Sequence, residues 1–384
     1  GTVVFNLTRA DPEFTTKLAL SFAWIIPSSV GTRPIGVRAA PGTGPYMIES
    51  YVPGKRIVLV RNPRFRVWAP DAQPTGSPDR IEASNAGRTT AALRLLPRYR
   101  PDVIKSEPTR EEADDVLVRY AGRTQSTAAP SAWYMYMNTH VRPFDDVRVR
   151  RALNYAVDRA RIAQLMGPPV LAQASCQVMP QGLLGYRPYC PYTRSPGRAG
   201  AWIGPDLTAA RRLVAASGRR GTRVTLLALP ITAAAARELA ATLRRLGFPT
   251  RTEVLPPGKL FPLANDSSRP VQASVTGWVA DYPSPVGFLF NLFDCRSFRP
   301  GSKDNTNFSE FCDPRSQAAM ERAAREPDVG AAGRLWAAAD RRLTDAAPVV
   351  PLITNRTMTI LSRRVENFQY HPLWGVLFDQ VSIR

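Results

Sequence analysis

The sequence predicts an α/β fold with irregular insertions, and three observations support this prediction. Runs rich in β-branched residues alternate along the chain with runs of helical periodicity. Residues 223–255 place a strand pattern, a helix pattern and a second strand pattern in direct succession, as in a βαβ unit. A chain of 384 residues is also long enough for two or three sub-domains, each with its own hydrophobic core.

The N-terminal part contains the pattern of a β-hairpin. The segment RIVLVRNPRF, residues 56–65, is rich in β-branched residues and predicts a strand that ends at Asn62 and Pro63. The preceding segment GTGPYMIESYVPGKR predicts a turn and a short strand, followed by a reversal of the chain at Pro53 and Gly54.

Residues 88–127 combine two different patterns. Residues 88–96 have helical periodicity, whereas residues 99–127 are polar and match neither the helical nor the strand period. The polar stretch contains four acidic side chains, which we interpret as a solvated face: Glu111, Glu112, Asp114 and Asp115.

A strand followed by a helix is predicted next. Residues 133–138 have a strand pattern, Pro143 interrupts the chain, and Asp145 or Asp146 is suited to cap a helix. The helical spacing is carried by the apolar residues Val149, Leu153, Ala156, Val157 and Ile162. Within the segment RVRRALNYAVDR we expect the apolar residues to pack inward and the arginines to face water. Residues 171–195 predict an irregular, proline-rich loop bracketed by cysteines.

The βαβ unit is the clearest local pattern in the chain. After a short amphipathic helix at residues 206–216, the segment RVTLLAL predicts a strand at residues 223–229. An alanine-rich helix follows at residues 233–246, and Gly247 is suited to the position just after its end. A second strand at residues 250–255 completes the unit, so we expect parallel pairing and a right-handed crossover.

The C-terminal part returns from helices to strands. Residues 318–324 and 331–346 have helical patterns, and the segment APVVPLI predicts a strand that Pro351 interrupts. The tail from residue 365 is aromatic and becomes strand-like at its end. The sequence contains no internal repeat and no long linker.

The charge of the chain admits two interpretations. A net charge of +20 and a pI of about 10.6 suggest binding to nucleic acid or to an anionic surface. Lysine, however, occurs only at positions 17, 55, 105, 259 and 303, and the abundant arginines are scattered. Together with the many alanines, prolines and glycines, this pattern favours the codon usage of a GC-rich genome over a nucleic-acid site.

Four cysteines form two local pairs, Cys176 with Cys190 and Cys295 with Cys312. A metal site would require closer cysteine spacing or nearby histidines, and the two histidines, His140 and His371, lie far from the cysteines in sequence. Two disulfides that close short loops fit better, each stabilising the chain by about 3 kcal/mol. Disulfides indicate an oxidising compartment outside the cytoplasm. The alternative is four buried thiols.

Signatures of catalysis are absent from the sequence. Two histidines leave little room for a Ser-His-Asp or Cys-His site, and neither GxSxG nor a P-loop occurs. No metal-ligand constellation and no run of about 18 apolar residues appears. We therefore predict no catalytic residue, no metal site and no cofactor.

The segment TGWVADYPSPVGFLFNLF places one carboxylate, Asp281, in a run of apolar and aromatic residues. A buried carboxylate is costly unless a cation meets it, so either the protein or a ligand must supply that cation. A second interpretation is that Asp281 caps a helix or pairs with a nearby arginine, and that Trp278 belongs to the core.

Four segments, taken in order, resemble the peptide- and nickel-type solute-binding proteins of ABC importers, family 5, which include dipeptide- and oligopeptide-binding proteins. They are GTGPYMIESYVPGKRIVLVRNPRF, MNTHVRPFDDVRVRRALNYAVDRARIAQLM, GWVADYPSPVGFLFNLF and ENFQYHPLWGVLFDQVSIR. The resemblance implies a class II periplasmic-binding-protein fold with two lobes that close over a ligand. It assigns residues 1–135 to part of the first lobe, residues 136–364 to the second, and residues 365–384 to a return into the first. By the same resemblance, the usual N-terminal portion is expected to be missing.

The resemblance also implies a function. The protein is expected to bind a solute, most simply a peptide, outside the cytoplasm as a monomer and to deliver it to a membrane permease. Asp281 matches the residue that pairs with the ligand's α-amino group, with Trp278 and Tyr282 beside it. Ser284 stands where many relatives carry a second acid, and the Cys295–Cys312 loop is expected to support the pocket wall. A ligand-sensing domain of a regulatory protein is the alternative function, and nucleic-acid binding is a more distant one.

Overall fold

The computed structural model describes residues 2–8, 10–33, 35–36, 38–87, 91–92, 101–106, 108–197, 200–269 and 271–384. The chain forms two compact units. Unit 1 comprises Gly1–Phe14 and Ala128–Arg356, and unit 2 comprises Thr15–Thr127 and Thr357–Arg384. The helix expected at residues 88–96 lies almost entirely outside the described residues, and the lobe boundaries taken from the resemblance stay a prediction.

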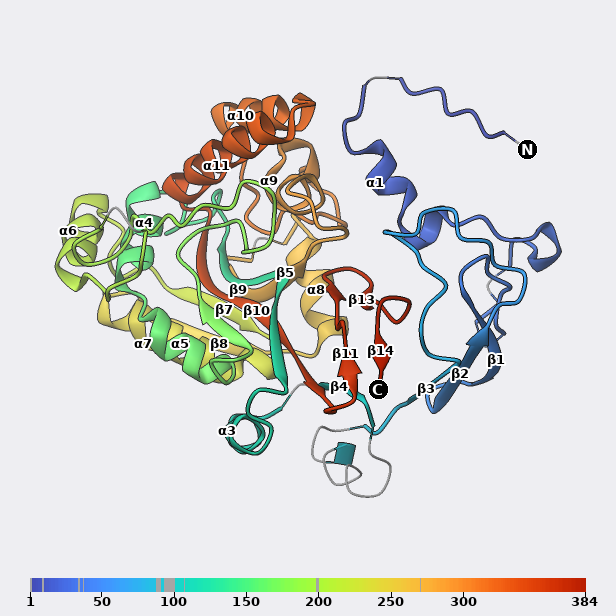
Figure 1. Cartoon of the computed structure of the whole chain (residues 1–384). Helices are drawn as coiled ribbons and strands as arrows, with labels where there is room; N and C mark the ends of the chain where they lie inside the picture. Colours follow the sequence, from blue (N-terminus) through green and yellow to red (C-terminus); the bar gives the residue numbers. More distant parts are fainter. Residues whose placement is uncertain are drawn as a thin grey trace. The chain divides into compact units, whose positions relative to one another are not determined.

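Unit 1 is built on a mixed β-sheet with helices on both faces (Figure 1). Its strands are hydrogen-bonded in the order β10-β5-β9-β7-β8, and β6 also pairs with β10. The bounds are β5 (Thr124–Met137), β6 (Ala172–Ala174), β7 (Val224–Ala228), β8 (Thr250–Val254), β9 (Ala273–Val279) and β10 (Val349–Leu361).

The two faces of this sheet bury separate hydrophobic cores because neighbouring residues of a strand point to opposite sides. Met135 and Met137 of β5 pack in the first core, with α4 (Val147–Ala156) and α7 (Ala233–Arg245). Tyr134 and Tyr136 of the same strand pack in the second core, with α10 (Pro314–Arg325) and α11 (Val329–Ala346). Unit 1 also contains α5 (Arg159–Met166), α6 (Leu207–Ser217), α8 (Pro257–Asn265) and α9 (Asn291–Phe293).

The predicted βαβ unit is confirmed. Strands β7 and β8 pair in parallel, with Val224 opposite Thr250, and α7 connects them. Gly247 follows the C-cap of α7 with a φ of 93°, a backbone conformation that residues with a Cβ rarely adopt.

The helix predicted after Asp146 is divided into two. Asp146 accepts a hydrogen bond from the backbone N–H of Arg148 and caps α4, as one of the two predicted candidates. The chain then becomes extended at Val157, and Asp158 caps a second helix, α5. Apolar periodicity did not reveal this break because Ile162 packs in the same core as the residues of α4.

The prediction that the arginines of RVRRALNYAVDR face water is wrong for Arg150 and Arg159, which are 7% and 0% exposed. Arg150 donates hydrogen bonds to the carbonyl oxygens of Phe144, Ala346 and Ala347. A guanidinium has five donors in a fixed plane, so it can satisfy several buried carbonyl oxygens at once.

Two other predicted segments differ in extent. Strand β10 continues through Pro351 instead of being interrupted there. The polar residues 99–127, to which no helix or strand was assigned, contain β4 (Val103–Ser106) and α3 (Arg110–Arg119). Helix α3 starts with a capping box between Thr109 and Glu112.

Unit 2 contains the predicted hairpin. Strands β1 (Tyr46–Val52) and β2 (Arg56–Arg61) pair antiparallel across the reversal, and β3 (Arg80–Ser84) adds a third strand beside β2. This unit also contains most of the short helix α1 (Phe14–Leu18). Its C-terminal segment forms two small ladders from four short strands: β11 (Val365–Glu366), β12 (Tyr370–His371), β13 (Gly375–Val376) and β14 (Ser382–Ile383).

Both predicted disulfides are present, Cys176–Cys190 and Cys295–Cys312. The loop closed by the first is attached to α11 through Asp340, which is 1% exposed. The Asp340 carboxylate accepts hydrogen bonds from the Gln177 side-chain amide at 2.6 Å and from the Met179 backbone N–H at 2.8 Å. Together with Thr344, whose hydroxyl accepts a hydrogen bond from the Val178 backbone N–H at 3.2 Å, this buried carboxylate attaches the disulfide loop to the helix layer.

Burial raises the pKa of Asp340 to about 7, although its hydrogen-bond donors act in the opposite direction. Because this folded-state pKa lies above the ordinary value of 3.8, the folded protein holds one more proton than the unfolded chain between those two pH values. The free energy of unfolding is therefore expected to fall as pH rises through this window, by up to about 1.4 kcal/mol per pH unit from this group.

The measurement is chemical denaturation of wild type and Asp340→Asn at pH 5 and pH 8, with Glu238→Gln, which removes a partly exposed carboxylate, as the control. The stability advantage of wild type over Asp340→Asn should shrink at pH 8. An advantage that grows with pH would show that the hydrogen-bond donors outweigh burial.

Candidate functional site

The predicted site lies where β9 ends and the chain turns into a helical segment. Trp278 is opposite Ala132 in the antiparallel ladder with β5, and the Ala280 backbone N–H donates to the Pro130 carbonyl at 2.8 Å. A π-helical turn, Val286–Phe290, then leads into α9. Asp281 therefore sits on a short loop held between a sheet and a helix.

Asp281 is exposed, contrary to the expectation that apolar neighbours bury it. Its carboxylate accepts a hydrogen bond from the Asn291 side-chain amide at 2.6 Å, and the same amide donates to the Gly287 carbonyl oxygen at 3.0 Å. Within the described part of the chain, no arginine or lysine forms an ion pair with it. Neither a protein cation nor a helix-capping role thus accounts for this carboxylate.

Trp278 is half-buried and packs against the second core. Its indole Nε1 is enclosed and has no hydrogen-bond partner among the described residues. Most of the side chain therefore packs against this core, as the core interpretation expects, and contact with a ligand stays a prediction.

Tyr282 is 6% exposed, and its hydroxyl donates to the Glu13 carboxylate at 2.7 Å. The Ser284 hydroxyl donates to the other oxygen of the same carboxylate. Burial, and after it the hydrogen bond to Glu13, raises the pKa of Tyr282. The Tyr282 hydroxyl is thus already engaged with the protein.

Glu13 was not identified from the sequence. It belongs to the N-terminal segment of unit 1 and lies 269 positions before Tyr282. An isolated glutamate in a polar segment has no local signal for such a contact, because the pairing depends on the tertiary structure.

The Tyr282 ring lies directly on Gly287. A Cβ placed on this glycine would come within 2.8 Å of Cε1 of the ring, so a side chain here would displace the tyrosine. The Ser284 hydroxyl also accepts a hydrogen bond from the Val286 backbone N–H at 3.0 Å, at the start of the π-helical turn. The loop and the following turn are therefore packed as one piece.

The Cys295–Cys312 disulfide closes the loop that follows α9. The Cys295 backbone N–H donates to the Gln317 side chain of α10 at 3.1 Å, which attaches this loop to the helix layer. This arrangement is compatible with the predicted support of the site, which stays a prediction.

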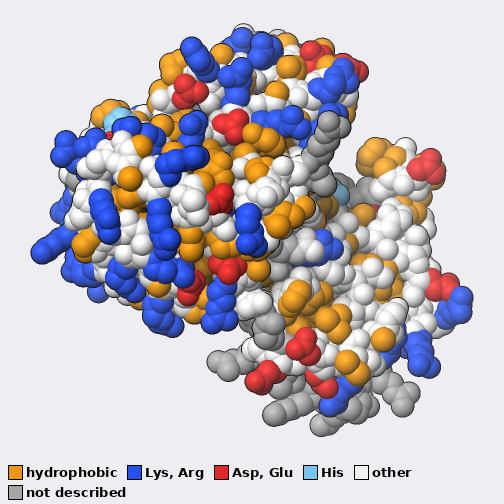
Figure 2. Space-filling view, turned by 90° about the vertical axis from the view of Figure 1, so that its left-hand side faces the viewer, with side chains coloured by type: hydrophobic (Ala, Val, Ile, Leu, Met, Phe, Trp, Pro, Cys, Tyr) orange, Lys and Arg blue, Asp and Glu red, His pale blue; other side chains and the backbone are white. Residues whose placement is uncertain are grey.

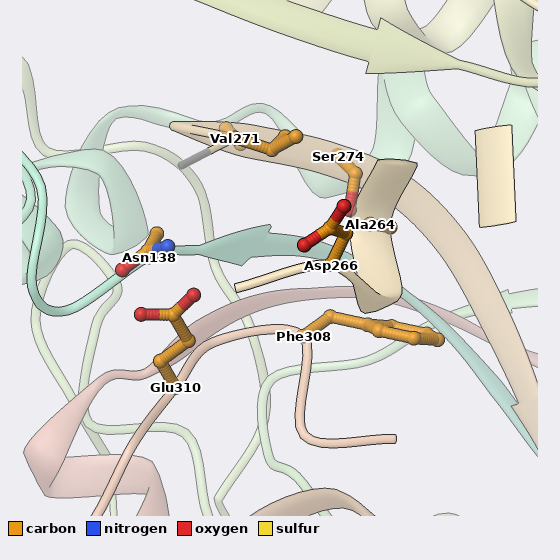
Figure 3. Close-up of a pocket in the computed structure, with 8 residues that line it drawn as sticks. Asn138, Ala264, Asp266, Val271, Ser274, Phe308 and Glu310 are labelled. Carbon is orange, nitrogen blue, oxygen red and sulfur yellow. The ribbon is translucent and has the colours of Figure 1, made fainter. Parts of the chain in front are cut away.

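A second polar feature of unit 1 is a cavity of about 10 Å³, roughly the space of one water molecule. Its walls include the side chains of Asn138, Asp266, Ser274 and Glu310, and the two carboxylates extend toward the same space (Figure 3). Burial raises the pKa of Glu310. The described residues contain no group of three histidine, cysteine or acidic side chains placed to hold a metal ion.

The basic residues form no single patch on the face shown in Figure 2, where lysine and arginine are spread among hydrophobic and acidic side chains. Among the described helices, none combines the length and apolar character needed to cross a membrane.

The sequence of this chain is similar to a family of bacterial binding proteins. The family model "Bacterial extracellular solute-binding proteins, family 5 Middle" matches residues 1–299. The dipeptide-binding protein of Escherichia coli K12 is 25% identical over an alignment 408 positions long, gaps included, which covers 100% of this chain and 70% of the relative. Di/tripeptide-binding protein 1 of Pseudomonas aeruginosa is 24% identical, with the same coverage of both chains.

Solved structures show the same similarity. The clavulanic acid biosynthesis oligopeptide binding protein 2 superimposes with a TM-score of 0.83 at 25% identity, over 99% of this chain and 70% of that chain. The unliganded open form of the periplasmic murein tripeptide binding protein MppA has a TM-score of 0.77 at 19% identity, over 98% and 71% of the two chains.

Proposed function

Because this chain belongs to the bacterial extracellular solute-binding proteins of family 5, we propose that it captures peptides and delivers them to the permease of an ABC importer. The class II periplasmic-binding-protein fold expected from the sequence is confirmed by the similar solved structures. The family is extracellular, so the protein acts outside the cytoplasm. Neither a regulatory sensor nor nucleic-acid binding finds support among these relatives.

Asp281 carries the peptide part of this proposal. An exposed carboxylate without a protein cation is available for a positively charged group of a ligand, and a peptide with a free N-terminus carries one, its α-ammonium. A charge-assisted hydrogen bond between the two would be short and stronger than a neutral one. The names of the relatives, which describe binders of dipeptides, tripeptides and oligopeptides, support the same ligand class.

The neighbouring residues have supporting roles in the proposal. Trp278 forms the wall under the Asp281 loop, where an aromatic face can attract a cation in addition to the carboxylate. Tyr282 acts through its hydrogen bond to Glu13. We propose a monomer that needs no cofactor and performs no chemical step on the peptide.

A thermal-shift experiment tests the ligand class. The purified chain is heated with a peptide library, with the same peptides N-acetylated, and with free amino acids, sugars and metal chelates. Peptides with a free amine should raise the melting temperature, because a ligand at 100 times its Kd adds about 2.7 kcal/mol to stability. Acetylated peptides should give no shift. Equal shifts from both forms, or a response to sugars alone, would contradict peptide capture through the amine.

A further inference from the structure

We propose that Glu13 is a positioning residue that holds the Asp281 loop in its binding geometry. This inference rests on the proposed function, since Asp281 is the amine anchor in that proposal. It assigns a role in ligand recognition to a residue of the N-terminal segment.

Glu13 contacts two buried side chains of the segment that carries Asp281. The Glu13 carboxylate accepts hydrogen bonds from the hydroxyls of Tyr282 and Ser284, two residues that are 6% and 5% exposed. A buried hydroxyl that loses its acceptor is left unsatisfied, so removing Glu13 should release both side chains.

The two hydroxyl-bearing residues are linked to Asp281 through the backbone and through hydrogen bonds. Tyr282 follows Asp281 directly in the chain, so holding its ring restricts the backbone that carries the Asp281 carboxylate. Ser284 binds the Val286 N–H at the start of the π-helical turn, and Asn291, one turn further, donates to Asp281. Glu13 is therefore connected to the Asp281 carboxylate both through Tyr282 and through Ser284.

The length of the Glu13 side chain and its negative charge can be tested separately. Glu13 could assist an incoming ammonium simply by being negative, but its two oxygens already accept hydroxyl donors. A positioning role requires the length of the side chain more than its charge. Glu13→Gln keeps the length, and its amide can still bond both hydroxyls, because a hydroxyl donates and accepts. Glu13→Asp keeps the charge but shortens the reach.

Amide hydrogen exchange of the ligand-free chain tests the positioning directly. In Glu13→Ala, residues 281–293 should exchange about tenfold faster than in wild type, while β10 is unchanged. Glu13→Gln should stay close to wild type and Glu13→Asp should resemble Glu13→Ala. Glu238→Ala, which removes another carboxylate of unit 1, serves as the matched control. The proposal is overturned if exchange in residues 281–293 does not respond to Glu13→Ala.

A double-variant comparison tests whether the effect passes through the two hydroxyls. Tyr282→Phe with Ser284→Ala should accelerate exchange of residues 283–293 about as much as Glu13→Ala does. Adding Glu13→Ala to that double variant should then change little, because groups that act through one contact are not additive. Fully additive effects would contradict the route through Tyr282 and Ser284.

The binding readout uses tri-alanine and N-acetyl-tri-alanine as probes. Glu13→Ala and Glu13→Asp should reduce the preference for the free amine about tenfold, and Glu13→Gln should restore it. If wild type binds neither probe while exchange responds as expected, the proposed function fails in this form and the positioning contact stands. If wild type prefers the free amine and all Glu13 variants share that preference, the positioning role fails and the proposed function stands.

Discussion

Replacing Asp281 by asparagine is expected to weaken binding of a free-amine peptide about thirtyfold or more. The substitution keeps the shape of the side chain, and its amide oxygen can still accept the hydrogen bond from Asn291. What it removes is the negative charge that meets the ligand's ammonium. Truncating one member of a desolvated charge pair costs about 2–5 kcal/mol, which corresponds to at least a thirtyfold change in Kd.

The size of the affinity loss in Asp281→Asn also shows whether the bound charge pair is shielded from water. A charge pair that remains exposed to water contributes about 0–1 kcal/mol, or at most about fivefold in affinity. Asp281 is exposed without a ligand. A loss of thirtyfold or more therefore means that ligand binding removes water from around this carboxylate, as enclosure of the peptide would.

Isothermal titration of wild type and Asp281→Asn with tri-alanine measures the effect. Asp304→Asn, which neutralises another exposed acid of unit 1, is the control and should bind as wild type does. Unchanged affinity in Asp281→Asn would remove Asp281 as the anchor. A loss that is equal for N-acetyl-tri-alanine would indicate damage to the loop instead of loss of the ammonium contact.

Replacing Arg159 by methionine is expected to destabilise the protein by about 3–5 kcal/mol. The guanidinium is fully buried and donates to the carbonyl oxygens of Ser175, Pro351 and Asn154 at 2.8–3.2 Å, and to the Asn154 side chain at 3.0 Å. Burial lowers its pKa to about 10, so it stays charged at neutral pH. Methionine fills similar space but leaves these buried acceptors without donors.

Chemical denaturation of wild type and Arg159→Met measures the difference, and Arg161→Met on the same helix is the matched control because Arg161 is exposed. Arg161→Met should change stability by less than about 0.5 kcal/mol. Arg159→Lys should also be destabilising, because an ammonium has three donors and lacks the planar arrangement of the guanidinium. Equal stabilities of Arg159→Met and Arg161→Met would show that the buried network contributes nothing.

Several elements could be predicted because their determinants are local. The βαβ unit follows from periodicity within one segment, and the hairpin of β1 and β2 follows from Pro53 and Gly54 between two β-branched runs. Asp145 and Asp146 were recognisable as candidate caps because a capping side chain bonds a backbone N–H two or three residues later. The cysteine pairs were recognisable because each closes a short loop.

Parts of the candidate site could not be predicted because they depend on residues far apart in the sequence. The sequence placed Asp281, Trp278 and Tyr282 on one segment, but apolar neighbours suggested burial where the structure has exposure. Glu13 reaches Tyr282 through the tertiary structure alone, and no pattern around either residue indicates the contact.

Local patterns in the sequence were thus enough to predict the α/β class, the order of most elements, the disulfide pairs and the loop that carries the candidate anchor. These features depend on periodicity, turn residues and spacing, which act over a few neighbouring residues. Only the folded chain shows that Arg150 and Arg159 are buried, that Asp281 is exposed and that Glu13 accepts hydrogen bonds from the Tyr282 and Ser284 hydroxyls. Burial and long-range hydrogen bonds depend on which surfaces meet in the folded chain, and composition or local pattern does not carry that information.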